Sequence, residues 1–154
     1  DEAMRGMGTT VVAAVVRDGS ACIANVGDSR AYWIGGEVRQ VTRDHSIVQL
    51  LVEHGQLTPE EALVHPKRHI ITRAIGAEPT VEAELFDLPL EGGALLLCSD
   101  GLSGVVPPDT IASAVRENPA SAPGKLIRMA LDMGSTDNVT ALVVYEDGKE
   151  AANG

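Results

Sequence analysis

The stretch LLLCSDGLSG, residues 95–104, joins a run of aliphatic residues directly to Ser99, Asp100 and Gly101. An apolar run of this length that is bounded by glycine is typical of a core strand. The end of a strand is where a rigid sheet presents a side chain to a functional site. Asp100 could therefore be a metal ligand, a general base or a helix cap, and the rest of the chain has to distinguish between these roles.

Length and composition indicate one globular domain with an aliphatic core. The 154 residues are enough to bury about 70% of the surface of the unfolded chain. Hydrophobic residues make up 44% of the chain and aromatic residues only 3%, so we expect a core of Val, Leu, Ile and Ala. No apolar stretch approaches the length of a transmembrane span, and we expect no membrane contact in this segment.

The charge balance argues against a nucleic-acid partner. Lys and Arg number 12 against 22 Asp and Glu, a net charge of −10, whereas a nucleic-acid surface needs a basic patch. An acidic surface is consistent with a site that concentrates divalent cations, and also with a solvated surface that has no binding role. Cys22 and Cys98 both lie in apolar runs, so we expect reduced core cysteines in a cytoplasmic protein rather than a disulfide.

Turn signals predict antiparallel strands in the first part of the chain. Asp18-Gly19 and Gly35-Gly36 are hairpin turns, and four strands in about forty residues imply antiparallel pairing. We expect strands at residues 9–16, 21–26, 31–34 and 37–41, later strands at 81–88, 94–98 and 138–146, and helices near 107–115 and at 122–133.

Residues 44–76 are predicted to be a helical insertion between strands. Residues 45–55 place apolar side chains at helical spacing. Thr58, Pro59 and Glu61 make the capping box of a second helix. Together with the strands on either side, the order of elements predicts an α+β sandwich.

Acidic residues stand at three strand ends: Asp28 in NVGDSRAY, Asp100, and Asp137 in GSTDNVT. Because antiparallel neighbours place the end of one strand beside the start of the next, Asp100 and Asp137 could meet at one rim of a sheet. Two carboxylates in one site repel unless a cation lies between them, and oxygen ligands suit Mg²⁺ or Mn²⁺ better than Zn²⁺. The alternative is that Asp100 caps a turn and Asp137 makes an Asx turn with Asn138.

The ordered segments GTT, NVGDSRAY, TRDHS, HPKRHIITRAIG, LLLCSDGL and GSTDNVTALVV resemble those of the metal-dependent PPM-type Ser/Thr protein phosphatases, most closely the bacterial ones. The resemblance runs from about residue 8 to residue 144. It implies two antiparallel sheets packed face to face, with helices outside and a metal cluster at one end. It also implies that phosphoserine and phosphothreonine in proteins are hydrolysed by a metal-activated water, with Mn²⁺ or Mg²⁺ as cofactor and a Ser/Thr kinase as the opposing enzyme.

The resemblance also assigns roles to individual residues. Asp100 and Asp137 match metal ligands of the family, and no side-chain nucleophile is required. Residues expected to have a structural role near the site are Asp28, Ser29, Arg30, Gly101 and Asn138. The insertion at 44–76 resembles a flap beside the active site, on which the residues expected to orient a phosphorylated peptide are Arg68, Thr72 and Arg73. The nearest candidates for a general acid are His45 and His54.

The chain departs from the family at its start. The family's opening segment carries an Arg that grips the phosphate, an acidic metal ligand and an Asp-Gly-x-Gly-Gly turn, and none of these is present; Asp1 and Glu2 are the only acidic candidates for a further ligand just before Gly-Thr-Thr. We therefore expect residues 1–146 to be the C-terminal two thirds of the domain, with the remaining N-terminal third elsewhere in the parent protein, and residues 147–154 to be a polar tail. The chain alone is then expected to lack metal ligands and activity, and to self-associate through exposed sheet edges.

Other functions fit less well. A non-catalytic pseudophosphatase or regulatory binding module of the same fold is the main alternative, but such a module would tend to lose Asp100 and Asp137 because unpaired buried carboxylates are costly. A thiol phosphatase needs an Arg six residues after its Cys, where this chain has Gly104. His65 and His69 have the i, i+4 spacing of zinc ligands, but a proline lies between them and no third ligand is evident.

Overall fold

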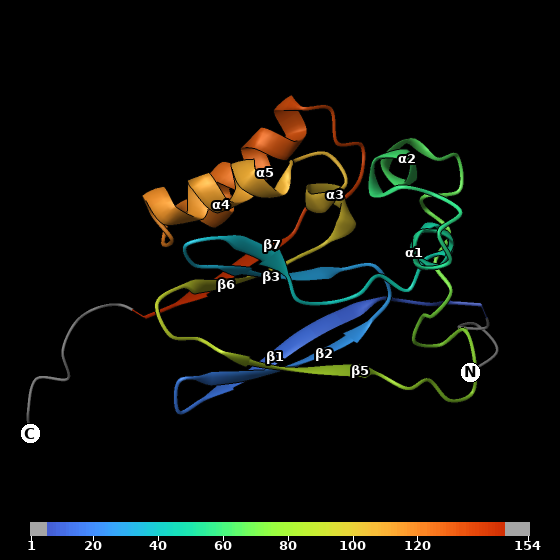
Figure 1. The fold of residues 1–154 in the computed structure, drawn as a ribbon, viewed down its shortest axis with the longest axis horizontal. Helices are drawn as coiled ribbons and strands as arrows, with labels where there is room; N and C mark the ends of the chain where they lie inside the picture. The colour runs from blue at the N-terminus through green and yellow to red at the C-terminus, as the bar shows by residue number, and fades with distance from the viewer. Residues whose placement is uncertain (1–5, 147–154) are drawn as a thin grey trace, which may run out of the picture.

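The computed structural model describes residues 6–146 and shows two antiparallel sheets lying face to face (Figure 1). The first sheet has the order β1–β2–β5, and its strands are β1 (Val11–Arg17), β2 (Ser20–Val26) and β5 (Glu84–Pro89). The second sheet has the order β4–β3–β6–β7, and its strands are β3 (Arg30–Ile34), β4 (Val38–Gln40), β6 (Ala94–Cys98) and β7 (Ala141–Tyr145). The predicted sandwich of two antiparallel sheets is confirmed.

The helices lie on one face and at one end of this sandwich. Helices α4 (Pro108–Glu117) and α5 (Ala122–Asp132) cover the outer face of the four-stranded sheet (Figure 1). The short helices α1 (Ile47–Glu53) and α2 (Pro59–Val64) lie at the same end of the sandwich as α3 (Asp100–Ser103). Within residues 6–146, no helix is long and apolar enough to cross a membrane.

Two hydrophobic layers explain the aliphatic run in β6. Successive side chains of a strand point to opposite faces of its sheet. Leu95 therefore packs between the two sheets with Ile23 and Leu88, whereas Leu96 packs beneath the helices with Leu126. Because both faces of β6 are buried, its sequence is continuously apolar rather than alternating.

Local sequence signals predict several turns and caps correctly. Asp18 and Gly19 both have a positive φ, 50° and 72°, which is the conformation of the two-residue hairpin turn that joins β1 to β2. Thr58 and Glu61 form the reciprocal capping box at the start of α2. These features depend on a few neighbouring residues, so sequence alone determines them.

Two predictions about the strands and helices need correction. The strand expected at residues 81–88 begins only at Glu84, because its partner β2 provides no pairing beyond Asn25, where the chain turns at Gly27. The sequence analysis does not predict helix α3, because Asp-Gly after a strand is also typical of a turn. The helix forms with Asp100 in its first turn, where a carboxylate interacts favourably with the helix dipole.

The prediction that both cysteines lie in the core is wrong for Cys22. Burial alternates along β2, so Ile23 faces the core and Cys22 faces outward and is exposed. Cys98 is buried as expected, and burial raises the pKa of its thiol to about 12. Both cysteines are free thiols, as expected.

Candidate functional site

The ends of β6 and β7 form one rim of the four-stranded sheet. Cys98, the last residue of β6, pairs with Ala141, the first residue of β7. Beyond this pair, the Ser99 N–H donates to the Thr140 carbonyl over 3.2 Å, and the Ser99 hydroxyl accepts from the Thr140 N–H over 3.0 Å. The same hydroxyl donates to the Asn138 carbonyl over 3.1 Å. These bonds hold the two chain segments side by side after regular pairing ends.

Gly101 permits the closest approach between these segments. A Cβ atom at Gly101 would lie only 2.4 Å from the carbonyl oxygen of Asn138, so no larger residue fits without a shift of backbone. The Ser135 hydroxyl donates to the Gly101 carbonyl over 2.8 Å and closes the contact from the other side. Asp100 and Asp137, each adjacent to one of the touching residues, are thereby brought to one rim of the sheet. This agrees with the expected meeting of the two strand ends.

The turn between β2 and β3 adds a third carboxylate to this rim. Gly27 has a φ of 111°, and a Cβ there would lie 2.3 Å from the Thr10 side chain, so the turn requires glycine. The pKa of the next residue, Asp28, is raised to about 6, first by burial and then by the negative charge of Asp100. Asp28 therefore faces the same region as Asp100. Ser29 stabilises the turn through its hydroxyl, 3.0 Å from the Thr10 hydroxyl.

An ion pair fixes the other end of this turn. The Arg30 guanidinium donates to both carboxylate oxygens of Asp44, over 2.6 to 3.1 Å, and to the Tyr32 hydroxyl over 3.0 Å. Burial alone would lower the pKa of Arg30, but the hydrogen bonds and charge of Asp44 and the nearby Tyr32 outweigh burial and raise it. The guanidinium of Arg30 is thus held by the Asp44 carboxylate. The partnership of Asp44 was missed, because nothing in the local sequence indicates a pair that is fourteen residues apart.

The flap residues lie at this end of the molecule. Arg68, Thr72 and Arg73 are all exposed, on the segment that follows α2. The Thr72 N–H donates to the His45 carbonyl over 2.7 Å, and Arg73 Nη1 lies 3.4 Å from His45 Nε2. The segment is therefore attached to the turn before α1 and leaves these side chains accessible. The structure gives Arg68 no side-chain partner among the described residues.

The histidines differ in how far their ring nitrogens are engaged by the protein, and only the environment of His45 argues against a general-acid role. His45 is only 4% exposed and both of its ring nitrogens contact protein atoms, so it has no free nitrogen from which to protonate a substrate. The His54 ring contacts the Leu50 carbonyl at the end of α1, and the Nδ1 of His65 accepts from the Lys67 N–H. Within residues 6–146, no three or more His, Cys, Asp or Glu residues form a group that could hold a metal ion, which disfavours the zinc alternative.

The donor set nevertheless suits a hard divalent cation that receives further ligands from elsewhere. Asp28, Asp100 and Asp137 offer carboxylate oxygens. After burial, the negative charge of Asp100 is the next cause that raises the pKa of Asp28, so these two carboxylates repel each other. A cation between such groups relieves that repulsion, and Mg²⁺ and Mn²⁺ are the cations that prefer oxygen ligands.

Comparison with known proteins places these features in context. A family model described as Protein phosphatase 2C matches residues 1–143. The serine/threonine phosphatase stp of Listeria monocytogenes serotype 4b is 41% identical over 149 residues, an alignment that covers 94% of this chain and 59% of the relative. The crystal structure of Stp1 from Staphylococcus aureus has a TM-score of 0.91 and 43% identity, and the match covers 96% of this chain and 60% of that one.

A further solved structure is described as the catalytic domain of the serine threonine protein phosphatase PstP in complex with two manganese ions. It has a TM-score of 0.81 and 39% identity to this chain, and the match covers 90% of this chain and 59% of that one. The chain thus spans less than two thirds of the length of the relatives that it matches.

Proposed function

Because this chain belongs to the protein phosphatase 2C family, we propose that it supplies part of the metal centre of a phosphatase that hydrolyses phosphoserine and phosphothreonine in proteins. The observation that carries this proposal is the acidic rim, where the ends of β6 and β7 bring Asp100 and Asp137 to the same edge of the sheet and where Asp28, in the β2–β3 turn, lies near Asp100. Retention of these carboxylates supports an enzyme rather than a non-catalytic binding module.

Asp100 and Asp137 would hold the cation, Mn²⁺ or Mg²⁺, and the relative that is described with two manganese ions supports this choice of metal. When bound, the cation supplies Lewis-acid activation of water and stabilisation of charge on the phosphoryl group. Asp100 and Asp137 act only as ligands, so neither has to exchange a proton. The Ser99 and Gly101 contacts with Asn138 keep the two ligands in register and limit the reorganisation needed when metal binds.

Substrate contacts would come from the flap rather than from the sheet. Arg30 is occupied by Asp44 and is not available to bind phosphate. Arg68 and Arg73 are exposed, and an Arg guanidinium can donate two parallel hydrogen bonds to a phosphate group. We assign them, with Thr72, to orient a phosphorylated peptide that a Ser/Thr kinase has produced. The free thiols Cys22 and Cys98 support a reducing compartment, the cytoplasm.

The test is hydrolysis of p-nitrophenyl phosphate and of a phosphothreonine peptide, each with and without millimolar Mn²⁺, by the full-length protein and by this 154-residue chain alone. We expect Mn²⁺-dependent turnover from the full-length protein and none from the folded chain alone, because residues 6–146 contain no complete set of metal ligands. Turnover by the chain alone would show that its centre is complete. Absence of turnover in the full-length protein would contradict the phosphatase function.

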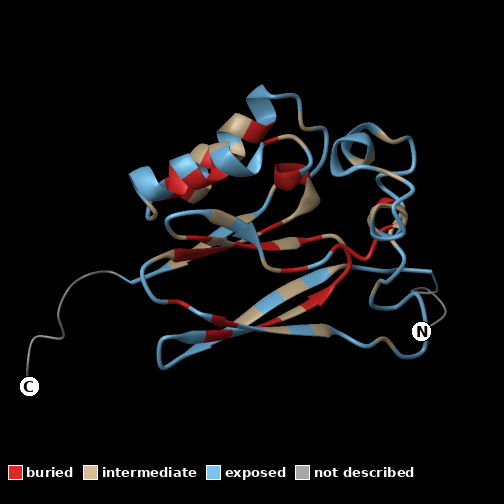
Figure 2. Ribbon diagram, viewed as in Figure 1, coloured by how far each residue is buried: buried red, intermediate tan, exposed pale blue. Residues whose placement is uncertain are grey.

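Self-association of the isolated chain is a separate proposal that the outer face of the three-stranded sheet supports. Val15 and Leu85 on this face are 72% and 66% exposed, and the strand register aligns Ala13, Ala24 and Leu85 in a row across the three strands. Figure 2 shows exposed and intermediate stretches along this sheet. An uncovered apolar sheet face next to edge strands favours association with a second copy. Sedimentation should therefore detect dimers or larger species of the isolated chain.

The matched variants for this experiment are Leu85→Lys on the sheet and Leu63→Lys on α2. Leu63 is 61% exposed, so the two leucines have similar exposure but lie on different surfaces. Leu85→Lys should shift the isolated chain toward monomer, whereas Leu63→Lys should not. A wild-type chain that remains monomeric at high concentration would refute the proposal.

A further inference from the structure

His45 lies where the acidic rim and the flap are joined. Its backbone N–H donates to the Gly27 carbonyl over 2.8 Å, and its own carbonyl accepts from the Thr72 N–H over 2.7 Å. Gly27 precedes Asp28 in the β2–β3 turn, and Thr72 belongs to the exposed flap segment. A single buried residue therefore connects the turn that carries Asp28, near Asp100 at the acidic rim, to the flap segment to which the proposed function assigns substrate contacts.

The imidazole ring strengthens the connection to the turn. His45 Nδ1 accepts a hydrogen bond from the Gly27 N–H over 3.0 Å, so this nitrogen carries no proton. A neutral imidazole has one N–H, which must then be on Nε2. Nε2 donates to Glu84 Oε2 on β5 over 3.2 Å. Arg73 Nη1 lies 3.4 Å from the same Nε2. It cannot donate to a nitrogen that already carries a proton, so Arg73 lies next to the His45–Glu84 hydrogen bond without taking part in it.

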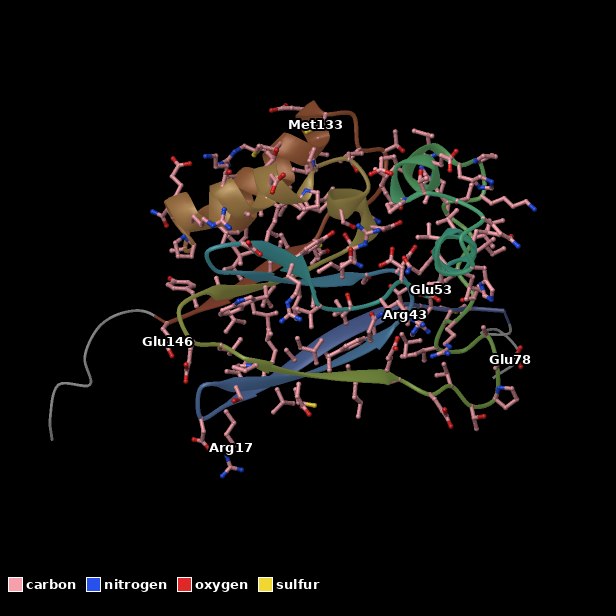
Figure 3. The ribbon with its side chains drawn as sticks, viewed as in Figure 1. Arg17, Arg43, Glu53, Glu78, Met133 and Glu146 are labelled. Atoms are coloured by element: carbon pink, nitrogen blue, oxygen red, sulfur yellow. The ribbon has the colours of Figure 1, made fainter. Side chains whose placement is uncertain are left out.

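Charged neighbours hold Glu84 in the position where it selects this tautomer. Arg43 Nε lies 3.6 Å from Glu84 Oε2, and Arg43 Nη1 donates to Glu53 Oε2 on α1 over 3.3 Å (Figure 3). Glu84 Oε2 therefore lies near the Arg43 guanidinium and accepts a hydrogen bond from His45 Nε2. A fixed carboxylate acceptor of this kind sets the tautomer and the orientation of a histidine ring.

The contacts of His45 lock the conformation of Gly27 on both sides. The Gly27 N–H donates to the imidazole and the Gly27 carbonyl accepts from the His45 backbone, so His45 contacts both peptide planes that flank this glycine. Asn25 Nδ2 also donates to the Gly27 carbonyl, over 3.3 Å, whereas the Gly27 N–H has the imidazole as its acceptor. Gly27 is buried and has a positive φ, and its peptide planes determine where Asp28 points. If the imidazole acceptor is lost, the buried Gly27 N–H has to rotate toward another partner, and Asp28 moves with it.

The flap is attached by the residues that follow His45. Ser46 pairs with Ile71, and the Ile47 N–H donates to the Ile70 carbonyl over 2.9 Å. With the bond between His45 and Thr72, these contacts form a short antiparallel connection between residues 45–47 and 70–72. A displacement of His45 is thus transmitted to the backbone that carries Thr72 and Arg73.

We propose that His45 is a positioning residue, which sets Asp28 at the acidic rim and Thr72 and Arg73 on the flap relative to each other. The proposal rests on the phosphatase function proposed above. His45 itself touches neither the metal nor the substrate; it acts through the Gly27 peptide and through the pairing of residues 45–47 with 70–72.

Two substitutions of His45 test the contacts of its two ring nitrogens separately. In His45→Asn, the side-chain oxygen occupies the position of Nδ1 and can still accept from Gly27, whereas the contact with Glu84 is lost. In His45→Gln, the longer amide can still reach Glu84, whereas the acceptor for Gly27 is lost. The control is Ser113→Ala on α4, because the Ser113 side chain is exposed and its hydroxyl donates to the Asp109 carbonyl of the same helix.

The kinetic readout is kcat of the full-length protein on p-nitrophenyl phosphate and on a phosphothreonine peptide at saturating Mn²⁺. We expect His45→Gln to lower kcat on both substrates roughly 10- to 100-fold, because small displacements of a site group have effects of this size. We expect His45→Asn to remain within about threefold of wild type, the loss that one hydrogen bond explains, and Ser113→Ala to be unchanged. Equal kcat values for His45→Gln and wild type, or equal losses in the Gln and Asn variants, would overturn the proposal.

A second measurement does not depend on activity. Nitrogen-15 spectra of the wild-type imidazole should show Nδ1 unprotonated and Nε2 protonated, and the amide signals of Asp28 and Thr72 should move in His45→Gln but stay in place in His45→Asn. A wild-type protein without Mn²⁺-dependent turnover would refute the proposed function alone. Unmoved Asp28 and Thr72 signals in His45→Gln would refute the positioning role alone.

Discussion

The contact between Gly101 and Asn138 predicts that Gly101→Ala disrupts the acidic rim. The added Cβ would lie 2.4 Å from the Asn138 carbonyl oxygen and 3.1 Å from its carbonyl carbon, both backbone atoms. Ordinary contact begins near 3.4 Å, so the segment that carries Asp137 has to withdraw by 3.4 − 2.4, about 1 Å. Overpacking of this kind costs about 1–3 kcal/mol, of which the better helix propensity of alanine offsets up to about 1 kcal/mol.

The assay combines urea unfolding with Mn²⁺ titration. With the full helix-propensity offset, Gly101→Ala should lower the free energy of unfolding by up to about 2 kcal/mol. It should also weaken Mn²⁺ binding, because Asp137 moves away from Asp100. The matched control is Gly124→Ala in α5, where the nearest neighbour of the added Cβ is the end of the Arg128 side chain at 4.0 Å. This control should stabilise the protein by about 0.5–1 kcal/mol. If Gly101→Ala matched its control in stability and kept wild-type Mn²⁺ affinity, the close contact would not hold the rim together.

Three further predictions follow from the carboxylates and the thiols. Asp100→Asn and Asp137→Asn should each weaken Mn²⁺ binding in calorimetry while leaving the circular dichroism spectrum unchanged; unchanged affinity in both variants would remove the ligand assignment. The pKa of Asp28 is raised from 3.8 to about 6, so the folded state binds the extra proton, and the metal-free protein should lose stability as the pH rises from about 4 to about 6. Asp28→Asn should flatten that slope in thermal melts, and an unaltered slope would assign it to another group. Cys22 should react with iodoacetamide in the native protein and Cys98 only after unfolding, as mass spectrometry would show; alkylation of native Cys98 would contradict its burial.

The fold could be predicted in large part because its signals are local. The two-residue turn at Asp18-Gly19, the capping box of α2 and the aliphatic run of β6 each depend on a few neighbouring residues. The register of β6 against β7 then brings Asp100 and Asp137 to one rim, a consequence of antiparallel pairing that the sequence also predicted. The outward direction of Cys22 was mispredicted, because an apolar neighbourhood does not reveal which face of a strand is covered.

The sequence by itself determined the family, the order of the elements and the two carboxylates at the strand ends, since these are properties of short segments and of their succession. Only the tertiary structure decided which distant groups meet. It partly buried Asp28 and placed it near Asp100, which together raise the pKa of Asp28, paired Arg30 with Asp44, and engaged both nitrogens of His45 with Gly27 and Glu84. The physical reason is that hydrogen bonds and charges act through space over a few ångströms. The partners are far apart along the chain, so no local sequence pattern indicates which of them will meet.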